Sequence, residues 1–191
     1  MSSRTLLAVG LMLAAAFSLG QAGWIHTKAL AAQWLLERAW VKVQDGAADA
    51  RPWPWADTAP VAELAVPRLD QRLLVLDAAS GRTLAFGPAH VAGSAPPGGF
   101  GNSVLTGHRD THFAFLRHLR SGDLVEIRDR SRATVSYRVE SIVVVRADEL
   151  RLTHFAPRRE LTLVTCYPFD TVTAGGPWRL VVRATETEVV G

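Results

Sequence analysis

The single cysteine of the chain, Cys166, stands where an apolar, β-branched run ends, two residues before a proline. Proline cannot donate to a strand ladder, so the sequence predicts that this thiol lies at the strand-to-loop boundary. A thiol so placed is a candidate nucleophile. The plainer interpretation, a small buried residue like most free cysteines, stays open. With one cysteine, no disulfide can form within the chain.

Two further side chains could serve a reactive thiol. His108 lies in a polar turn that follows a buried-looking strand, and it could transfer protons, or be a solvated turn residue. Arg179 opens the apolar run after the cysteine and could donate to an oxyanion, or lie free on the surface. Asp110 could orient the imidazole or simply close the turn. Together these groups are the minimal set for thiol-based acyl transfer.

Composition argues against several other functions. The six histidines are dispersed and have no cysteine partners, and the turn-like flanks of His108 and His112 do not suit a zinc-protease helix. We therefore predict no metal site and no cofactor. The net charge is only +3, and the arginines are scattered among acidic residues with no basic stripe. We therefore expect no nucleic acid partner.

The N-terminal segment predicts contact with a membrane. No charged residue occurs between Arg4 and Lys28, and the intervening run is mostly apolar. This is typical of a short membrane anchor, with a cleaved signal peptide as the alternative. We expect residues 1–23 to be an uncleaved single-pass anchor in the cytoplasmic membrane, with the rest of the chain facing the periplasm or the cell exterior. A strict count of the flanking positive charges favours the opposite orientation.

Residues 24–67 are predicted to form an amphipathic helix followed by a linker rich in proline and tryptophan. We expect Trp53 and Trp55, in the linker, to dock on the domain surface rather than to bind a partner. The helix covers residues 28–43, and its apolar stripe is expected to comprise Leu30, Trp34, Leu35, Ala39 and Val43.

From residue 68 onward the pattern changes to strands. Residues 72–76 and 83–86 flank an Ala-Ser-Gly turn signal and predict a hairpin. A Pro- and Gly-rich loop at 95–101 precedes the next strand. Further strands are predicted at 103–106, 123–128, 133–145, 160–165 and 178–185, with a short helical turn at 113–119. About seven strands with so little helix predict an all-β closed barrel or a sandwich.

Three motifs in this region resemble the sortase family. They are Thr-Leu-Val-Thr-Cys at 162–166, Thr-Gly-His-Arg-Asp-Thr-His-Phe at 106–113, and Arg179 in the following strand. The resemblance covers roughly residues 72–184 and includes Gly-Asp followed by a Val-Glu-Ile strand at 122–127. The short chain, the N-terminal anchor and the Cys-Tyr-Pro-Phe string resemble the proteobacterial class GN branch.

The resemblance implies a closed eight-stranded β-barrel with short helices, over residues 68–188, and a cysteine transpeptidase. Such an enzyme cuts a Leu-Pro-x-Thr-Gly-like sorting signal of a substrate protein, holds the acyl fragment as a thioester on Cys166, and transfers it to an amine acceptor, for example one in the cell envelope. By position, His108 would transfer protons and Arg179 would stabilise the oxyanion. The loops 95–101 and 169–176 would border the substrate groove. We expect a monomer. Substrate contacts are predicted at Thr165, Asp110, Tyr167 and Trp178.

Two other classes of protein remain as alternatives. L,D-transpeptidases also pair a barrel-borne cysteine with a histidine, but their cysteine usually sits in a Ser-x-Gly-Cys setting, whereas Thr165 and Tyr167 flank this one. A membrane-tethered β-domain that binds a partner, with an incidental cysteine, is the non-enzymatic alternative. An accessible, reactive thiol would favour an enzyme over the binding domain.

Overall fold

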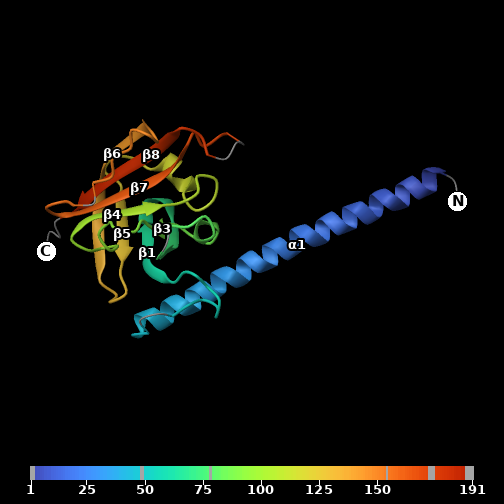
Figure 1. The fold of residues 1–191 in the computed structure, drawn as a ribbon, viewed down its shortest axis with the longest axis horizontal. Helices are drawn as coiled ribbons and strands as arrows, with labels where there is room; N and C mark the ends of the chain where they lie inside the picture. The colour runs from blue at the N-terminus through green and yellow to red at the C-terminus, as the bar shows by residue number, and fades with distance from the viewer. Residues whose placement is uncertain (1–2, 48–49, 78, 154, 172–174, 188–191) are drawn as a thin grey trace.

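The fold is a β-barrel joined to one long helix (Figure 1). The computed structural model describes residues 3–47, 50–77, 79–153, 155–171 and 175–187. Residues 1–2 of the predicted anchor and residue 188 of the predicted barrel range lie outside them. The helix is α1 (Ser3–Gln44). The strands are β1 (Pro60–Val66), β2 (Gln71–Leu76), β3 (Ala89–His90), β4 (Gly101–Thr106), β5 (Leu124–Arg128), β6 (Thr134–Arg146), β7 (Arg159–Tyr167) and β8 (Trp178–Glu186).

Within the described residues, the eight strands close into a barrel in the order β1-β2-β3-β4-β7-β8-β6-β5. This confirms the predicted closed, eight-stranded β-barrel. Most neighbours are antiparallel, but β4 runs parallel to β7, and the two-residue β3 runs parallel to β2. Short 3-10 segments connect the strands, namely η1 (Pro67–Leu69), η2 (Thr83–Ala85) and η3 (Ala114–His118). The parallel β4–β7 pair matters most, because it aligns the carboxyl ends of two strands.

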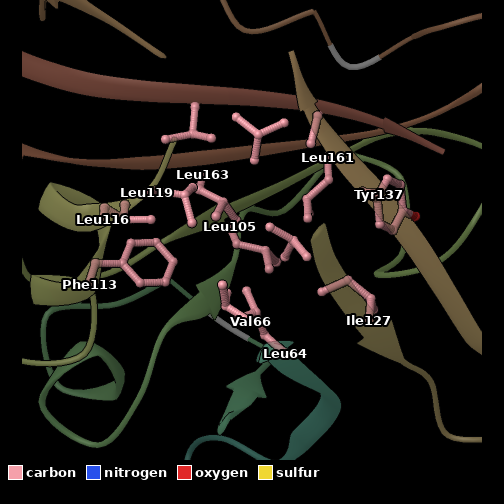
Figure 2. Packing of buried hydrophobic residues seen from close by; sticks show 14 of the residues in the cluster. Leu64, Val66, Leu105, Phe113, Leu116, Leu119, Ile127, Tyr137, Leu161 and Leu163 are labelled. Atoms are coloured by element: carbon pink, nitrogen blue, oxygen red, sulfur yellow. The ribbon is translucent and has the colours of Figure 1, made fainter. Parts of the chain in front are cut away.

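The core fills the inside of the barrel. It is built from side chains at every second position along the strands, because successive side chains point to opposite faces. On β7, Leu161 and Leu163 are fully buried in this core, which they share with Leu105 of β4 (Figure 2). Because side chains alternate between the two faces of a strand, Cys166 is on the outer face of β7. Phe113, directly before η3, and Leu116 of η3 close one side of the core.

Two local predictions were wrong, and one short strand was missed. Residues 83–86 do not form the second strand of a hairpin, because η2 occupies Thr83–Ala85. The linker predicted up to residue 67 contains β1, which pairs with both β2 and β5. Proline is tolerated as the first residue of a strand, as at Pro60, so the proline-rich composition concealed this strand. The short β3 was also missed.

The helix α1 packs on the barrel with its C-terminal part only, and its N-terminal part extends away from the barrel (Figure 1). The buried face does not match the predicted stripe, because Leu30 is 73% exposed and Trp34 is 54% exposed. Ala39 and Val43 are buried as expected. The residues of α1 buried against the rest of the chain are Ala32, Leu36, Ala39, Trp40 and Val43, at helical spacing.

The two linker tryptophans differ in their surroundings. Trp53 is half-buried and packs edge-on against Phe86, with ring centroids 5.2 Å apart, so it docks as predicted. Trp55 does not dock, because its side chain is exposed. Among the described residues, no helix combines the length and the apolar character needed to cross a membrane.

Candidate active site

Cys166 and Arg179 lie side by side on the outer face of the barrel. The two residues are direct partners in the antiparallel register of β7 and β8. Side chains of such partners share one face of the sheet, with Cβ atoms about 4.5–5.5 Å apart. The thiol is free and half-buried. The strand β7 ends at Tyr167, directly before Pro168, as the sequence predicted.

His108 reaches the same end of the barrel from β4. The last register pair of the parallel strands joins Thr106 to Val164, and the Gly107 amide continues the ladder by donating to the Val164 carbonyl at 3.3 Å. If this register is extended by two residues, His108 lies opposite Cys166. The two backbones are then one strand spacing apart, about 4.8 Å. The imidazole is exposed. The structure thus brings the predicted nucleophile, proton-transfer group and cation to one place.

A buried hydrogen bond ties the His108 segment to the cysteine strand. The Thr165 hydroxyl donates to the Gly107 carbonyl at 2.8 Å, and the Thr106 hydroxyl donates to the Val164 carbonyl at 3.2 Å. Thr165 is only 2% exposed. This burial argues against the predicted contact between the Thr165 side chain and a substrate. Its hydroxyl instead fixes the residue before His108 relative to the residue before Cys166.

Packing fixes the other end of the His108 turn. Phe113 is fully buried, its ring points into the core (Figure 2), and its amide donates to the His108 carbonyl at 2.9 Å. The turn passes so close to this ring that a Cβ atom at Gly107 would lie 2.8 Å from it. Glycine at this position therefore lets the backbone approach the aromatic ring.

Arg109, directly after His108, connects this turn to the segment that follows β7. Arg109 is 6% exposed, and its Nη2 donates to the Thr171 carbonyl at 3.1 Å. Nearby, the Arg117 guanidinium lies 4.9 Å from the centroid of the Phe169 ring. Our sequence reasoning assigned no role to either arginine. The only signal for Arg109 was its place next to His108 in the 106–113 motif.

The guanidinium of Arg179 is positioned by backbone carbonyls. Its Nη1 donates to the carbonyls of Gly176 and Trp178, both at 2.8 Å. Backbone carbonyls from the segment before β8 and from the first residue of β8 therefore fix the orientation of this guanidinium. Part of that segment, residues 172–174, lies outside the described residues.

The remaining predicted substrate contacts lie around this group. Tyr167 and Trp178 are the next register partners along β7 and β8, and Trp178 is 40% exposed. Tyr167 is half-buried, and its ring packs edge-on against Phe169. Asp110 is exposed in the turn. All three lie at the cysteine end of the barrel, and their roles toward a substrate stay predictions.

Burial and ion pairing shift the pKa values of His112 and Asp123, which lie outside the Cys166–His108–Arg179 group. Burial lowers the pKa of His112 below its ordinary value, and the nearby charge of His108 adds to this effect. At the start of β5, hydrogen bonds from Arg68 at 2.6 Å lower the pKa of Asp123. Asp123 also accepts from the Arg120 amide, so this pair stabilises the turn between η3 and β5. Among the described residues, no group of acidic, histidine or cysteine side chains is arranged to hold a metal ion.

The segment between β6 and β7 covers part of the outer face that carries Cys166. Asn102 of β4 donates from Nδ2 to the Thr153 carbonyl at 2.6 Å and accepts from the Thr162 hydroxyl at 2.9 Å. Val164 and Val181, also on this outer face, are buried. On this face, two buried valines therefore lie between the thiol and the place where the β6–β7 segment is attached.

The loop at 95–101 does not border the cysteine as predicted. It leads into Gly101, whose register partner on β7 is Arg159. Arg159 and Cys166 are seven residues apart along one strand, or about 23 Å at about 3.3 Å per residue. Gly98 instead packs near Ile127 and Val135 at the opposite end of the barrel.

Comparisons with known proteins agree with this geometry. A family model described as a sortase domain matches residues 64–187. Sortase D of Bacillus subtilis is 30% identical over 122 residues, which are 62% of this chain and 60% of that protein. The chain therefore spans about 60% of the length of this curated relative.

Solved structures give the same result. Sortase C-1 from Actinomyces oris superposes with a TM-score of 0.59 at 30% identity, covering 69% of this chain and 76% of its own. A lid mutant of sortase A from Corynebacterium diphtheriae superposes with a TM-score of 0.62 at 27% identity, covering 81% and 92%. The residues matched by the family model, 64–187, include all three candidate residues.

Proposed function

Because this chain belongs to the sortase family, we propose that it is a cysteine transpeptidase that uses Cys166, His108 and Arg179. The observation that carries the proposal is the strand register, in which Cys166 pairs with Arg179 and His108 comes level with them from β4. Family membership favours this function over the L,D-transpeptidase and binding-domain alternatives. Membership of class GN within the family stays a prediction.

The proposed reaction has two acyl transfers. The Cys166 sulfur attacks the threonine carbonyl of a Leu-Pro-x-Thr-Gly-like signal, and Arg179 donates hydrogen bonds to the oxyanion that forms. The threonine–glycine C–N bond breaks, His108 gives a proton to the departing amine, and a thioester remains on Cys166. An incoming amine then attacks the thioester and loses a proton to His108. The new amide bond forms as the C–S bond breaks.

We place the substrate peptide on the outer face of β4 and β7, beside the segment 147–158. Three features support this location. Cys166 lies on that face, buried apolar side chains such as Val164 line it, and the 147–158 segment is attached to it through Asn102. Tyr167 and Trp178 form the register pair next to Cys166 and Arg179, and Tyr167 packs against the core. Trp178, which is 40% exposed, and the exposed part of Tyr167 would contact the residues nearest the cleaved bond. Asp110, exposed beside His108, would contact the part of the substrate that departs.

A transpeptidation assay tests this proposal. Purified protein is incubated with a Leu-Pro-x-Thr-Gly peptide library and a panel of amines, and the products are identified by mass spectrometry. We expect a ligated product in which the amine replaces the glycine, and we expect Cys166→Ala and His108→Ala to abolish it. Cleavage that persists in Cys166→Ala would exclude the cysteine mechanism. A protein that is folded and has an accessible thiol, yet processes no library member, would exclude this substrate class.

We also propose that residues 1–23 tether the protein to the cytoplasmic membrane, with the barrel outside the cytoplasm as a monomer. The support is the stretch without charged residues between Arg4 and Lys28. Fractionation of cells that express the full chain tests the tether, and protease accessibility in intact spheroplasts tests the orientation. Recovery of the chain in the cytosolic fraction would overturn both.

A further inference from the structure

A cavity of about 380 Å³ lies between the inner face of α1 and the strands β1 and β2. It is separate from the outer face of β7 that carries Cys166, since β3 and β4 lie between β2 and β7 in the barrel. Its size falls within the range of small-molecule sites, about 300–1,000 Å³. The polar residues that carry the argument below are Trp40, Gln44, Glu63, Arg72 and Arg128.

Three buried donor nitrogens line this cavity and find no acceptor among the described residues. They are Nε1 of Trp40, Nε2 of Gln44 and Nε of Arg128. Trp40 is only 5% exposed, so water outside the protein cannot satisfy its indole N–H. Buried polar groups nearly always have a partner, because an unpaired buried donor costs about 1–3 kcal/mol. Three such donors on one cavity indicate that the cavity holds hydrogen-bond acceptors.

The charges on the cavity wall balance, so the unpaired donors decide the chemistry of the ligand. Glu63 is almost buried and is shared by two guanidinium groups, with Arg128 at 2.6 Å and Arg72 at 3.6 Å. Glu37 also lines the cavity, and both Glu37 and Arg72 are exposed, so water screens these two charges. A carboxylate supplies only hydrogen-bond acceptors, whereas a carboxamide brings N–H donors that would face the three unpaired donors.

Part of the wall is apolar, with contributions from Val41, Leu74, Phe86 and Pro88. A simple inorganic anion would contact none of this surface, and the volume greatly exceeds that of one water molecule, about 30 Å³. An anion with an apolar body would fill both parts. The three unpaired donors and the apolar part of the wall together fit an organic carboxylate.

We propose that this cavity is a binding site for a small organic carboxylate, whose oxygens accept hydrogen bonds from Trp40, Gln44 and Arg128. The carboxylate lies beside the Glu63–arginine cluster, and its apolar body lies against the Leu74–Phe86 wall. Two sources offer this chemistry, a free carboxylic acid and the C-terminal carboxylate of a peptide. The site is independent of the proposed transpeptidation and stands or falls without it.

The test follows the indole N–H of Trp40 in the full, ¹⁵N-labelled chain by NMR. The signal is identified by its loss in Trp40→Phe or, if that variant does not fold, by assignment of the wild type. Benzoate serves as the free acid and N-acetyl-leucine as the peptide terminus. Benzamide and N-acetyl-leucinamide are their uncharged controls. We expect at least one acid to shift the Trp40 signal saturably, with a dissociation constant on the order of 1 mM, while neither amide does.

Variants separate this site from general binding to the protein. Gln44→Leu is expected to weaken the acid about tenfold, whereas Trp34→Phe, on the exposed side of the same helix, leaves binding unchanged. The better of the two acids identifies the source of the carboxylate. Equal binding of acid and amide, an unmoved Trp40 signal with both acids, or unchanged affinity in Gln44→Leu would overturn the proposal and leave ordered water as the partner of the three donors.

Discussion

The hydrogen bond from Thr165 to Gly107 predicts a specific loss of activity in Thr165→Val. Valine has nearly the shape of threonine but cannot donate, so the buried Gly107 carbonyl loses this partner. An unpaired buried acceptor costs about 1–3 kcal/mol. This bond joins the residue before His108 to the residue before Cys166, so its loss lets the turn move away from the thiol.

The size of the effect follows from that free energy. If the whole cost appears as displacement of the His108 turn, the fraction of correctly placed molecules falls about 5- to 150-fold, because each 1.36 kcal/mol is a factor of ten. We expect kcat/KM to fall about tenfold, near the lower part of this range, since neighbouring groups relax. Thr165→Ser keeps the hydroxyl and is expected to retain most of the activity.

The assay compares peptide cleavage rates with thermal unfolding for each variant. Thr58→Val is the matched control, because Thr58 is also buried and its hydroxyl also donates a hydrogen bond, at 2.7 Å, but to Asp77. Both valine variants are expected to lose stability, and only Thr165→Val is expected to lose activity per folded molecule. Equal activity of the two variants would refute a positioning role for Thr165.

Three further predictions concern the frame of the site. Gly107→Ala would place a methyl group 2.8 Å from the buried Phe113 ring, so we expect the free energy of unfolding to fall by about 1–3 kcal/mol. Gly81→Ala is the control, because the space around Gly81 is open and we expect no change in the free energy of unfolding. Because Arg68 lowers the pKa of Asp123, the charged carboxylate stabilises the fold above its ordinary pKa, and this contribution disappears as the pH falls through the lowered value. Asp123→Asn should therefore lower Tm at pH 7, and the difference from wild type should shrink in acid; a constant difference would contradict the ion pair. Arg179→Ala is expected to reduce kcat about 10²- to 10³-fold, and Arg179→Lys should restore only part of this because lysine lacks fixed planar donors; full activity in Arg179→Lys would show that charge alone suffices.

The strands of the barrel could be predicted where their apolar runs are long. The end of β7 at Tyr167 follows from Pro168, and the run after Arg179 is unambiguous. By contrast, β1 lies between Pro60 and Pro67, and its strand conformation depends on pairing with β5, more than sixty residues away, as in Glu63 with Arg128. No local pattern contains that information.

In the candidate site, too, the residue types could be predicted from the sequence, but the long-range contacts that position them could not. The types of Cys166, His108 and Arg179 suggested their chemistry, and the register of β4, β7 and β8 brings them together. The contacts that position them, such as Thr165 with Gly107 and Arg109 with Thr171, join segments about sixty residues apart. The face of α1 was also beyond prediction, because Trp34 and Trp40 both suit an apolar stripe and only the barrel surface decides between them.

In the proposed reaction, the Cys166 thiol forms a thioester with a sorting-signal peptide. The most direct measurement is the intact mass of the protein after incubation with a Leu-Pro-x-Thr-Gly peptide and no added amine. We predict an added mass equal to the peptide cut after threonine, located on Cys166, released by hydroxylamine and absent in Cys166→Ala. A peptide that is cleaved with no adduct on wild type under rapid acid quench, or an equal adduct on Cys166→Ala, would contradict this account.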